Sequence, residues 1–193
     1  DGGIAFTVQA DVSLEADIIR MFDEVTERLG DPSGLVNSAG VGGKHMLVSD
    51  FEKVELEQLM QVNVIGTMLC CREASRRMST QFGGSGGSIV NVSSMASTIG
   101  GRPGNSAYAA SKAAVDAFTV GFAKEIGTQG IRVNAVAPGM TKTERGKDLE
   151  KLNFGALQEE LYTPRIPLGR RALPEEIAEV VTFLVSEKAS YVT

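Results

Sequence analysis

Apolar residues recur along the chain with two different periods. Short runs of consecutive apolar residues predict buried strands, and longer stretches with apolar residues three or four positions apart predict helices that cover a sheet with one face. The two kinds of segment alternate, and there is no internal repeat. The predicted strands lie at about 4–9, 35–37, 89–92 and 131–137, and the predicted helices at about 13–29, 52–81, 106–126 and 174–184.

Local signals mark several of these boundaries. Ser13 is expected to cap the first helix and Gly30 to end it, while Pro174 suits the first position of the last helix. The tract GGSGGS at 83–88 resembles a flexible linker. Because it directly precedes a buried-type strand, it is interpreted as a helix-to-strand loop and not as a domain boundary.

The alternation of strands and helices predicts an α/β fold with a doubly wound parallel sheet, in one domain spanning 1–193. In such a sheet the ligand crevice lies outside the carboxyl ends of the strands. Polar residues or glycines follow four of the predicted strands, at 11–12, 37–40, 93–94 and 138–143. We expect these segments to line one crevice.

The composition argues against several classes of partner. The 193 residues carry a formal net charge of −5 and the pI is about 5.0, so no basic surface for nucleic acid is indicated. No apolar run approaches the roughly 20 residues that span a membrane, and the first residues do not resemble a signal peptide. The sequence therefore predicts a cytoplasmic protein without a nucleic-acid or membrane partner.

Residues that could bind metal or carry redox chemistry are few. Cys70 and Cys71 are adjacent in a predicted helix, where neighbouring side chains diverge, so buried thiols are predicted and not a disulfide. His45 is the sole histidine and is interpreted as a loop or substrate-rim residue. No metal site is expected. The arginine pairs at 76–77 and 170–171 are interpreted as solvated or ion-paired charges.

Tyr108 and Lys112 form the strongest candidate for chemistry. They lie four residues apart in the run YAASK, so on a helix their side chains share one face. An ammonium close to a phenol favours the phenolate, which suits a general acid/base. The same spacing also arises by chance in an alanine-rich helix, so the pair alone does not establish a site.

Further motifs give the pair its context. They occur in the order Asp11-Val12, NSAG at 37–40, NVIGT at 63–67, GSIVNVSS at 87–94, YAASK at 108–112 and NAVAPG at 134–139. With these motifs the chain resembles the short-chain dehydrogenase/reductase family over essentially its whole length. In wording and spacing it is most similar to sugar-dehydrogenase-like and 3-oxoacyl-carrier-protein-reductase-like members.

The resemblance implies an oxidoreductase that transfers a hydride between NAD or NADP and a secondary alcohol or ketone. It implies four catalytic residues. Tyr108 would exchange the hydroxyl proton, and Ser94 would hydrogen-bond the substrate oxygen. Lys112 would bind the nicotinamide ribose and tune Tyr108, and Asn63 would position a proton-relay water.

The resemblance also implies a set of cofactor contacts: Asp11, Val12, Asn37, Ala39, Gly40, Tyr108, Lys112, Pro138, Gly139 and Thr143. Two departures from the family pattern are visible. Ser38 stands where the family has the second Asn of NNAG. The loop at 95–107 is slightly longer than in many relatives, which leaves Ser93 as a weaker alternative to Ser94 for the catalytic serine.

Two regional features follow from the same resemblance. The polar segment at 144–166 falls where the family carries a substrate lid. The family forms homotetramers through the two helices at 52–81 and 106–126, and small or apolar residues such as Ala113, Ala117 and Phe118 would suit that packing. These residues would equally suit a helix that only covers the sheet.

The glycine-rich dinucleotide fingerprint of the family has no counterpart near the start of the chain. We therefore expect the first βαβ portion, about 50 residues or more, and the last strand to be absent from this sequence. The acidic or basic residue that would select NAD or NADP falls in that portion, so the cofactor choice is open. Two alternatives remain: a nucleotide-binding module without catalysis, and an inactive fragment without the dinucleotide cradle.

Overall fold

A parallel sheet forms the centre of the computed structural model, which describes residues 3–143 and 163–193. Its strands are β1 (Gly34–Asn37), β2 (Gly87–Val92) and β3 (Ile131–Val136), in the order β1-β2-β3. Gly34 is in register with Ser88, and Val92 with Val136. The carboxyl ends of the strands therefore lie at one edge of the sheet.

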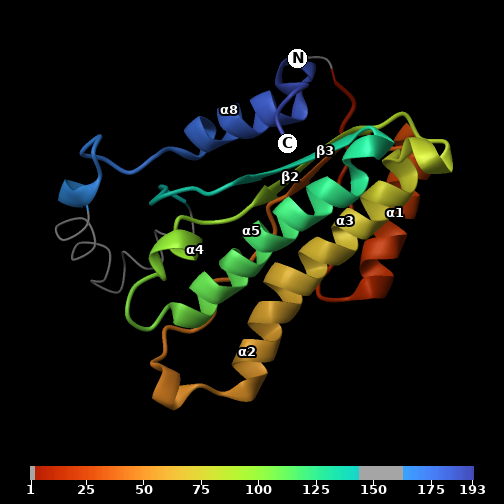
Figure 1. Cartoon of the computed structure of the whole chain (residues 1–193). Coiled ribbons are helices and arrows are strands. Elements are labelled where there is room, and N and C mark those ends of the chain that lie inside the picture. The colour runs from red at the N-terminus through yellow and green to blue at the C-terminus, as the bar shows by residue number, and fades with distance from the viewer. Residues whose placement is uncertain (1–2, 144–162) are drawn as a thin grey trace.

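Helices cover both faces of this sheet (Figure 1). The helices α1 (Glu15–Leu29), α3 (Thr67–Met78) and α5 (Ser106–Ile126) lie on one face, and α8 (Pro174–Val185) lies on the other. Successive strand residues point to opposite faces. Accordingly, Ile89 belongs to the core beneath α1, α3 and α5, whereas Val90 packs with Leu184 of α8. The predicted doubly wound α/β arrangement is confirmed.

The larger of the two cores fills the space between the sheet and the three helices. It has no charged member, and its residues come from strands and helices far apart in sequence. Its buried residues are Ile18, Phe22, Cys70, Cys71, Ala74, Met78, Ile89, Phe122, Ile126, Ile131 and Val133.

Two predictions for the first segment are wrong. The run 4–9 does not form a strand, because a strand needs a hydrogen-bonded neighbour and the described residues supply none beside it; Ile4 is 84% exposed. Ser13 does not cap α1, which begins at Glu15 with Leu14 at the N-cap position. The Ser13 N–H and hydroxyl instead both donate to Asp11 Oδ1, at 2.8 and 2.7 Å.

The long helix predicted at 52–81 is interrupted. It divides into α2 (Lys53–Met60), a π-helical turn η2 (Gln61–Gly66), α3, and a short 3₁₀ turn η3 (Thr80–Phe82). A Cβ added at Gly66 would lie 2.5 Å from the carbonyl oxygen of Val12, so the turn needs glycine where this backbone crosses it. Single π-turns of this kind are frequent at functional sites.

The glycine-rich tract at 83–88 is the tight return from α3 to β2, as predicted. Gly86 has a φ of 80°, and a Cβ there would overlap the backbone carbonyl of Gly130. After β2 the loop at 95–107 contains the short helix α4 (Ala96–Ile99), which the apolar pattern did not predict.

The buried cysteines and charges behave as the sequence predicted. Cys70 and Cys71 are free and buried, and burial raises the pKa of the first to about 11 and of the second to about 12. Glu73 is buried on α3 and ion-paired with three arginines of that helix, and Arg170 pairs with Glu176. In the described part of the chain, no helix combines the length and the apolar character needed to cross a bilayer.

Candidate active site

The side chain of Asn63 joins three segments at the centre of the candidate site. It is fully buried in η2. Its Nδ2 donates to the carbonyl oxygen of Val41 at 2.9 Å and to Ser111 Oγ at 3.0 Å, and its Oδ1 accepts from the Val41 N–H at 2.8 Å. Every hydrogen-bonding direction but one of the amide is thus used, which fixes the loop after β1 and the helix α5 relative to η2.

The helix α5 brings three residues of YAASK to this point. Ser111 Oγ, besides accepting from Asn63, donates to the backbone carbonyl of Tyr108 at 2.8 Å. Lys112 is 6% exposed, and its Nζ donates to the carbonyl oxygen of Val92 at 2.8 Å. Tyr108 is half-buried one turn earlier on the helix. The structure therefore brings Asn63, Tyr108 and Lys112 to one end of α5.

Burial also sets the electrostatics of the lysine. Loss of solvent lowers the pKa of Lys112 below its ordinary value, and the charge of Asp116 opposes that change. A lysine ammonium has three N–H donors, of which the bond to Val92 uses one. The group is thus held at the end of β2 with donor capacity for a ligand.

The two serines at the end of β2 have different surroundings. Ser93 is buried; its N–H donates to Val136 and its Oγ to the carbonyl of Lys112, at 2.7 and 3.2 Å. Ser94 is half-buried, and its Oγ accepts from the N–H of Ala96 at 3.1 Å. The Ser94 hydroxyl hydrogen remains available in this geometry, whereas Ser93 ties β2 to β3 and α5.

The loop after β1 approaches the same place. A Cβ added at Gly40 would lie 3.3 Å from Asn63 Oδ1 and 3.6 Å from Lys112 Nζ, so Gly40 borders the lysine directly, and Ala39 before it is exposed. Asn37 behaves differently: its Nδ2 donates to Asn91 Oδ1 at 2.9 Å. The Asn37 side chain thus connects β1 to β2, so a ligand would contact Asn37 through its backbone.

The remaining predicted cofactor residues lie in two places, before α1 and after β3. Asp11 is exposed, and its hydrogen bonds from Ser13 lower the pKa of its carboxyl. Val12 lies against η2 at Gly66. Pro138 and Gly139 follow β3, where the Pro138 carbonyl accepts from the N–H of Met95 at 3.0 Å. Thr143 is exposed at the last described position before 163.

These observations test whether the nicotinamide half of a dinucleotide suits the site. A Cβ at position 40 would crowd Asn63 Oδ1 and contact Lys112 Nζ, so glycine there leaves the space that a ligand needs to reach the lysine. A buried ammonium is a suitable donor to ribose hydroxyls. The residues present fit that half of the cofactor.

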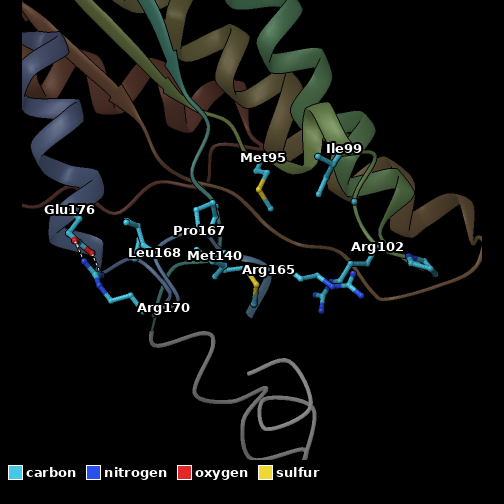
Figure 2. Close-up of a pocket in the computed structure, with 14 residues that line it drawn as sticks. Met95, Ile99, Arg102, Met140, Arg165, Pro167, Leu168, Arg170 and Glu176 are labelled. Atoms are coloured by element: carbon cyan, nitrogen blue, oxygen red, sulfur yellow. Dashed lines mark hydrogen bonds and ion pairs between the residues drawn. The ribbon is translucent and has the colours of Figure 1, made fainter. Parts of the chain in front are cut away.

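A pocket of about 640 Å³ adjoins the ends of β2 and β3 (Figure 2). Its described lining comes from the loop after β2, the residues after β3, the segment before α8 and the first turn of α8. Neither Tyr108 nor Lys112 is among the lining residues, which begin at Met95, next to Ser94. The lining residues are Met95, Ile99, Gly101, Arg102, Pro103, Gly139, Met140, Arg165, Ile166, Pro167, Leu168, Arg170, Ala172 and Glu176.

Several residues of the site and of the pocket were not predicted from the sequence. Ser111 stands inside YAASK directly before Lys112, so the motif itself contained that signal. Met95 and Met140 carried no pattern that distinguished them from other apolar loop residues. Most of the predicted lid, 144–162, lies outside the described residues; its last part forms the 3₁₀ turn η5 (Thr163–Arg165) and lines the pocket.

His45 lies in the loop after β1, as predicted, with its ring against Gly104. Within 3–143 and 163–193, no group of three or more histidine, cysteine, aspartate or glutamate side chains is arranged to hold a metal ion.

Comparison with known proteins identifies the class. A family model described as enoyl-(acyl carrier protein) reductase matches residues 1–193. An uncharacterised oxidoreductase, YgfF, from Escherichia coli K12 is 40% identical over 100% of this chain and 76% of its own length. The 3-oxoacyl-[acyl-carrier-protein] reductase of Rattus norvegicus is 38% identical over 100% of this chain and 75% of its length.

A solved structure supports the same class of protein. A short-chain type dehydrogenase/reductase from Mycobacterium ulcerans superposes with a TM-score of 0.85 at 29% identity, covering 95% of this chain and 64% of that one. The chain belongs to the short-chain dehydrogenase/reductase family. It is therefore an oxidoreductase that uses NAD or NADP and acts on alcohol or carbonyl groups, as the sequence motifs predicted.

Proposed function

We propose that the chain catalyses the interconversion of a secondary alcohol and a ketone through Asn63, Ser94, Tyr108 and Lys112. Tyr108 exchanges the proton with the substrate oxygen, and Ser94 donates its hydroxyl hydrogen to that same oxygen. Lys112 holds the nicotinamide ribose and favours the negative charge that forms on Tyr108. Asn63 fixes α5 and the loop after β1 in the positions that these roles require.

One observation carries the proposal: the buried amide of Asn63 connects the loop at Val41 with Ser111, one residue from Lys112. Lys112 in turn donates to Val92, two residues from Ser94. Asn63 and Lys112 are thus held by hydrogen bonds at the end of α5, and Tyr108 and Ser94 lie within a few residues of these bonds along the chain. Such fixed positions supply the alignment on which a two-substrate reaction depends.

The hydride itself is the chemistry that the bound nicotinamide supplies. For the protein, the remaining tasks are proton transfer at Tyr108 Oη and orientation of the substrate oxygen. Gly40, Ala39, Pro138 and Gly139 would border the nicotinamide half, and Asp11 with Val12 the adenine half. Positioned proton transfer is worth roughly 10²- to 10⁴-fold in rate.

Tyr108→Phe tests the assignment in the native enzyme. With ketone and sugar panels and both cofactors, we expect kcat to fall at least 100-fold while cofactor affinity is retained. Tyr191→Phe is the matched control, because Tyr191 is fully exposed, and it should leave kcat unchanged. Cofactor binding without any turnover in the unsubstituted enzyme would support a catalytically silent nucleotide-binding module instead.

We further propose a homotetramer, as the family resemblance implies. Several apolar side chains on the outer side of the helix layer are exposed, among them Ile65, Met68 and Val120, at 41%, 37% and 57%. Phe118, in contrast, packs against the core and contributes to covering the sheet. Val120→Glu should shift the native enzyme toward smaller species in analytical ultracentrifugation; an unchanged sedimentation coefficient would count against this interface.

The proposed location is the cytoplasm. Support comes from the two free, buried thiols, which suit a reducing compartment. Fractionation of cells that produce the protein, followed by detection with an antibody, would test this location.

A further inference from the structure

The pocket beside the candidate active site has an apolar interior. Met95, Ile99, Met140 and Leu168 supply much of its lining, and Figure 2 shows Met95 and Ile99 opposite Met140 and Leu168. Its volume of about 640 Å³ lies within the range of small-molecule sites. An apolar interior of this size stabilises a ligand that buries hydrocarbon surface.

The pocket begins beside the carboxyl ends of β2 and β3, next to Ser94. Met95 follows Ser94 directly, and its N–H donates to Pro138, so the loops after β2 and β3 are joined at this point. Farther along, Ala172 bridges the segment at Met140 and Lys142: its N–H donates to the Met140 carbonyl, and its carbonyl accepts from the Lys142 N–H, both at 2.9 Å. A substrate held at Ser94 would therefore extend along fixed backbone into the pocket.

Among the described lining residues, three are arginines, Arg102, Arg165 and Arg170, and one, Glu176, is acidic. Arg170 forms a two-pronged ion pair with Glu176, at 2.7 and 2.6 Å, and this pair neutralises itself. Arg102 and Arg165 come from opposite sides of the pocket, and in Figure 2 their side chains extend toward one another. Each guanidinium has five N–H donors, so each can bind a ligand anion in addition to contacts with the protein.

We infer that the substrate carries an anionic group at the end of an apolar segment, and that Arg102 and Arg165 bind that group. The inference rests on the proposed function, since it takes Ser94 and Tyr108 as the position of the reacting carbonyl. The recognised chemistry is an oxyanion, either a carboxylate or a phosphate. Arginine suits both, because its planar fork matches their oxygen geometry.

Matched substrates test the inference in the native enzyme with its cofactor. The set contains an aliphatic keto acid, its methyl ester, the corresponding keto alkyl phosphate and the corresponding keto alcohol. We expect kcat/KM for at least one anionic member to exceed that of its neutral partner, with the excess falling as ionic strength rises. The carboxylate and phosphate arms identify which oxyanion is preferred.

Two variants then assign the preference to residues. Arg102→Gln and Arg165→Gln should each lower kcat/KM for the preferred anion by roughly 10- to 100-fold and change the neutral partner less than about threefold. Arg28→Gln is the control, because Arg28 lies on α1 in a surface ion pair with Glu24. Equal losses on both members of a pair, or no preference in the unsubstituted enzyme, would overturn the inference.

A measurement without turnover separates this inference from the proposed function. Decanoate should raise the melting temperature of the native enzyme and decanol should do so less, and the difference should vanish in Arg102→Gln. If Tyr108→Phe left turnover unchanged while the decanoate effect depended on Arg102, the catalytic assignment would fail and the anion site would stand. An equal effect of decanoate on the enzyme and on Arg102→Gln would eliminate the anion site alone.

Discussion

Replacing Asn63 with aspartate is the sharpest test of the central hydrogen-bond set, because the two side chains have the same size and shape. The substitution keeps the oxygen that accepts from the Val41 N–H at 2.8 Å. It replaces the NH₂ that donates to Val41 and Ser111, at 2.9 and 3.0 Å, with an acceptor. When ionised, the new group makes neither bond and faces two oxygens in a site with no solvent exposure; when protonated, it can make one of the two.

The magnitude follows from these losses. In the protonated form the new carboxyl has one O–H donor in place of two N–H donors, so one neutral hydrogen bond is still lost, at about 1 kcal/mol net. Keeping the buried carboxyl protonated at neutral pH adds about 1.4 kcal/mol for each unit by which its pKa is raised. We expect Asn63→Asp to lower the free energy of unfolding by about 3 to 5 kcal/mol at pH 7.

The pH dependence has a defined sign. Burial beside carbonyl and hydroxyl oxygens raises the pKa of the introduced carboxyl in the folded state above the unfolded value of about 3.9. The folded variant therefore binds more protons than the unfolded chain above that pH. Its free energy of unfolding falls as the pH rises from the unfolded pKa to the folded pKa. The loss in free energy of unfolding, relative to the native enzyme, should be smaller at pH 5 than at pH 8.

Urea unfolding of the native enzyme and the variant at these two pH values measures the effect. Asn134→Asp is the matched control: Asn134 Nδ2 makes one exposed hydrogen bond, to Val192 at 2.9 Å, so its loss should be below about 1 kcal/mol. If Asn63→Asp were no more costly than the control, or if its cost did not grow with pH, the amide would not be the connection described here.

Three further outcomes are expected. Glu73→Gln should destabilise the fold by about 3 kcal/mol in urea unfolding, because it leaves a buried ion-pair cluster on α3 without its carboxylate. Gly66→Ala should cost about 1 to 3 kcal/mol, since its Cβ meets a backbone carbonyl at 2.5 Å, whereas Gly121→Ala, with open space around it, should be neutral or stabilising. Cys70 and Cys71, with pKa values of about 11 and 12, should resist iodoacetamide at pH 8 in the native enzyme and react after denaturation, as mass spectrometry would show.

Each of these outcomes can contradict its premise. A cost for Glu73→Gln below about 1 kcal/mol would mean that solvent, and not the cluster, stabilises the arginines. Equal effects of alanine at the two glycines would remove the argument for close backbone approach. Rapid alkylation of the native thiols would mean that α3 opens readily.

The sequence predicted those elements whose residues agree locally with the final fold. Helix α5 is predicted with the bounds that it has, Ser106–Ile126, because its many alanines favour a helix. The strand ends were located for the same reason: apolar runs end in glycine or polar residues at 37–40, 93–94 and 138–143. The parallel sheet followed from the alternation of these elements.

The remaining features depend on contacts between distant residues. The π-turn at Asn63 coincides with bonds to Val41 and Ser111, 22 and 48 positions away, which no local pattern contains. The pocket combines side chains near 95, 140 and 165, and only the folded chain brings them together. The catalytic roles came from motif order in the family and stay a prediction until variants are measured.

The bonds of Asn63 divide the molecule into a part that tolerates little change and a part that can diverge. One amide spans three segments, so a change of one residue in the length of 37–41, 61–66 or 108–111 would misplace the rest of the site. The pocket side chains project from other loops, near 95–103 and 163–172. Exchange of those loops could therefore alter what the enzyme accepts while the reaction it performs is inherited unchanged.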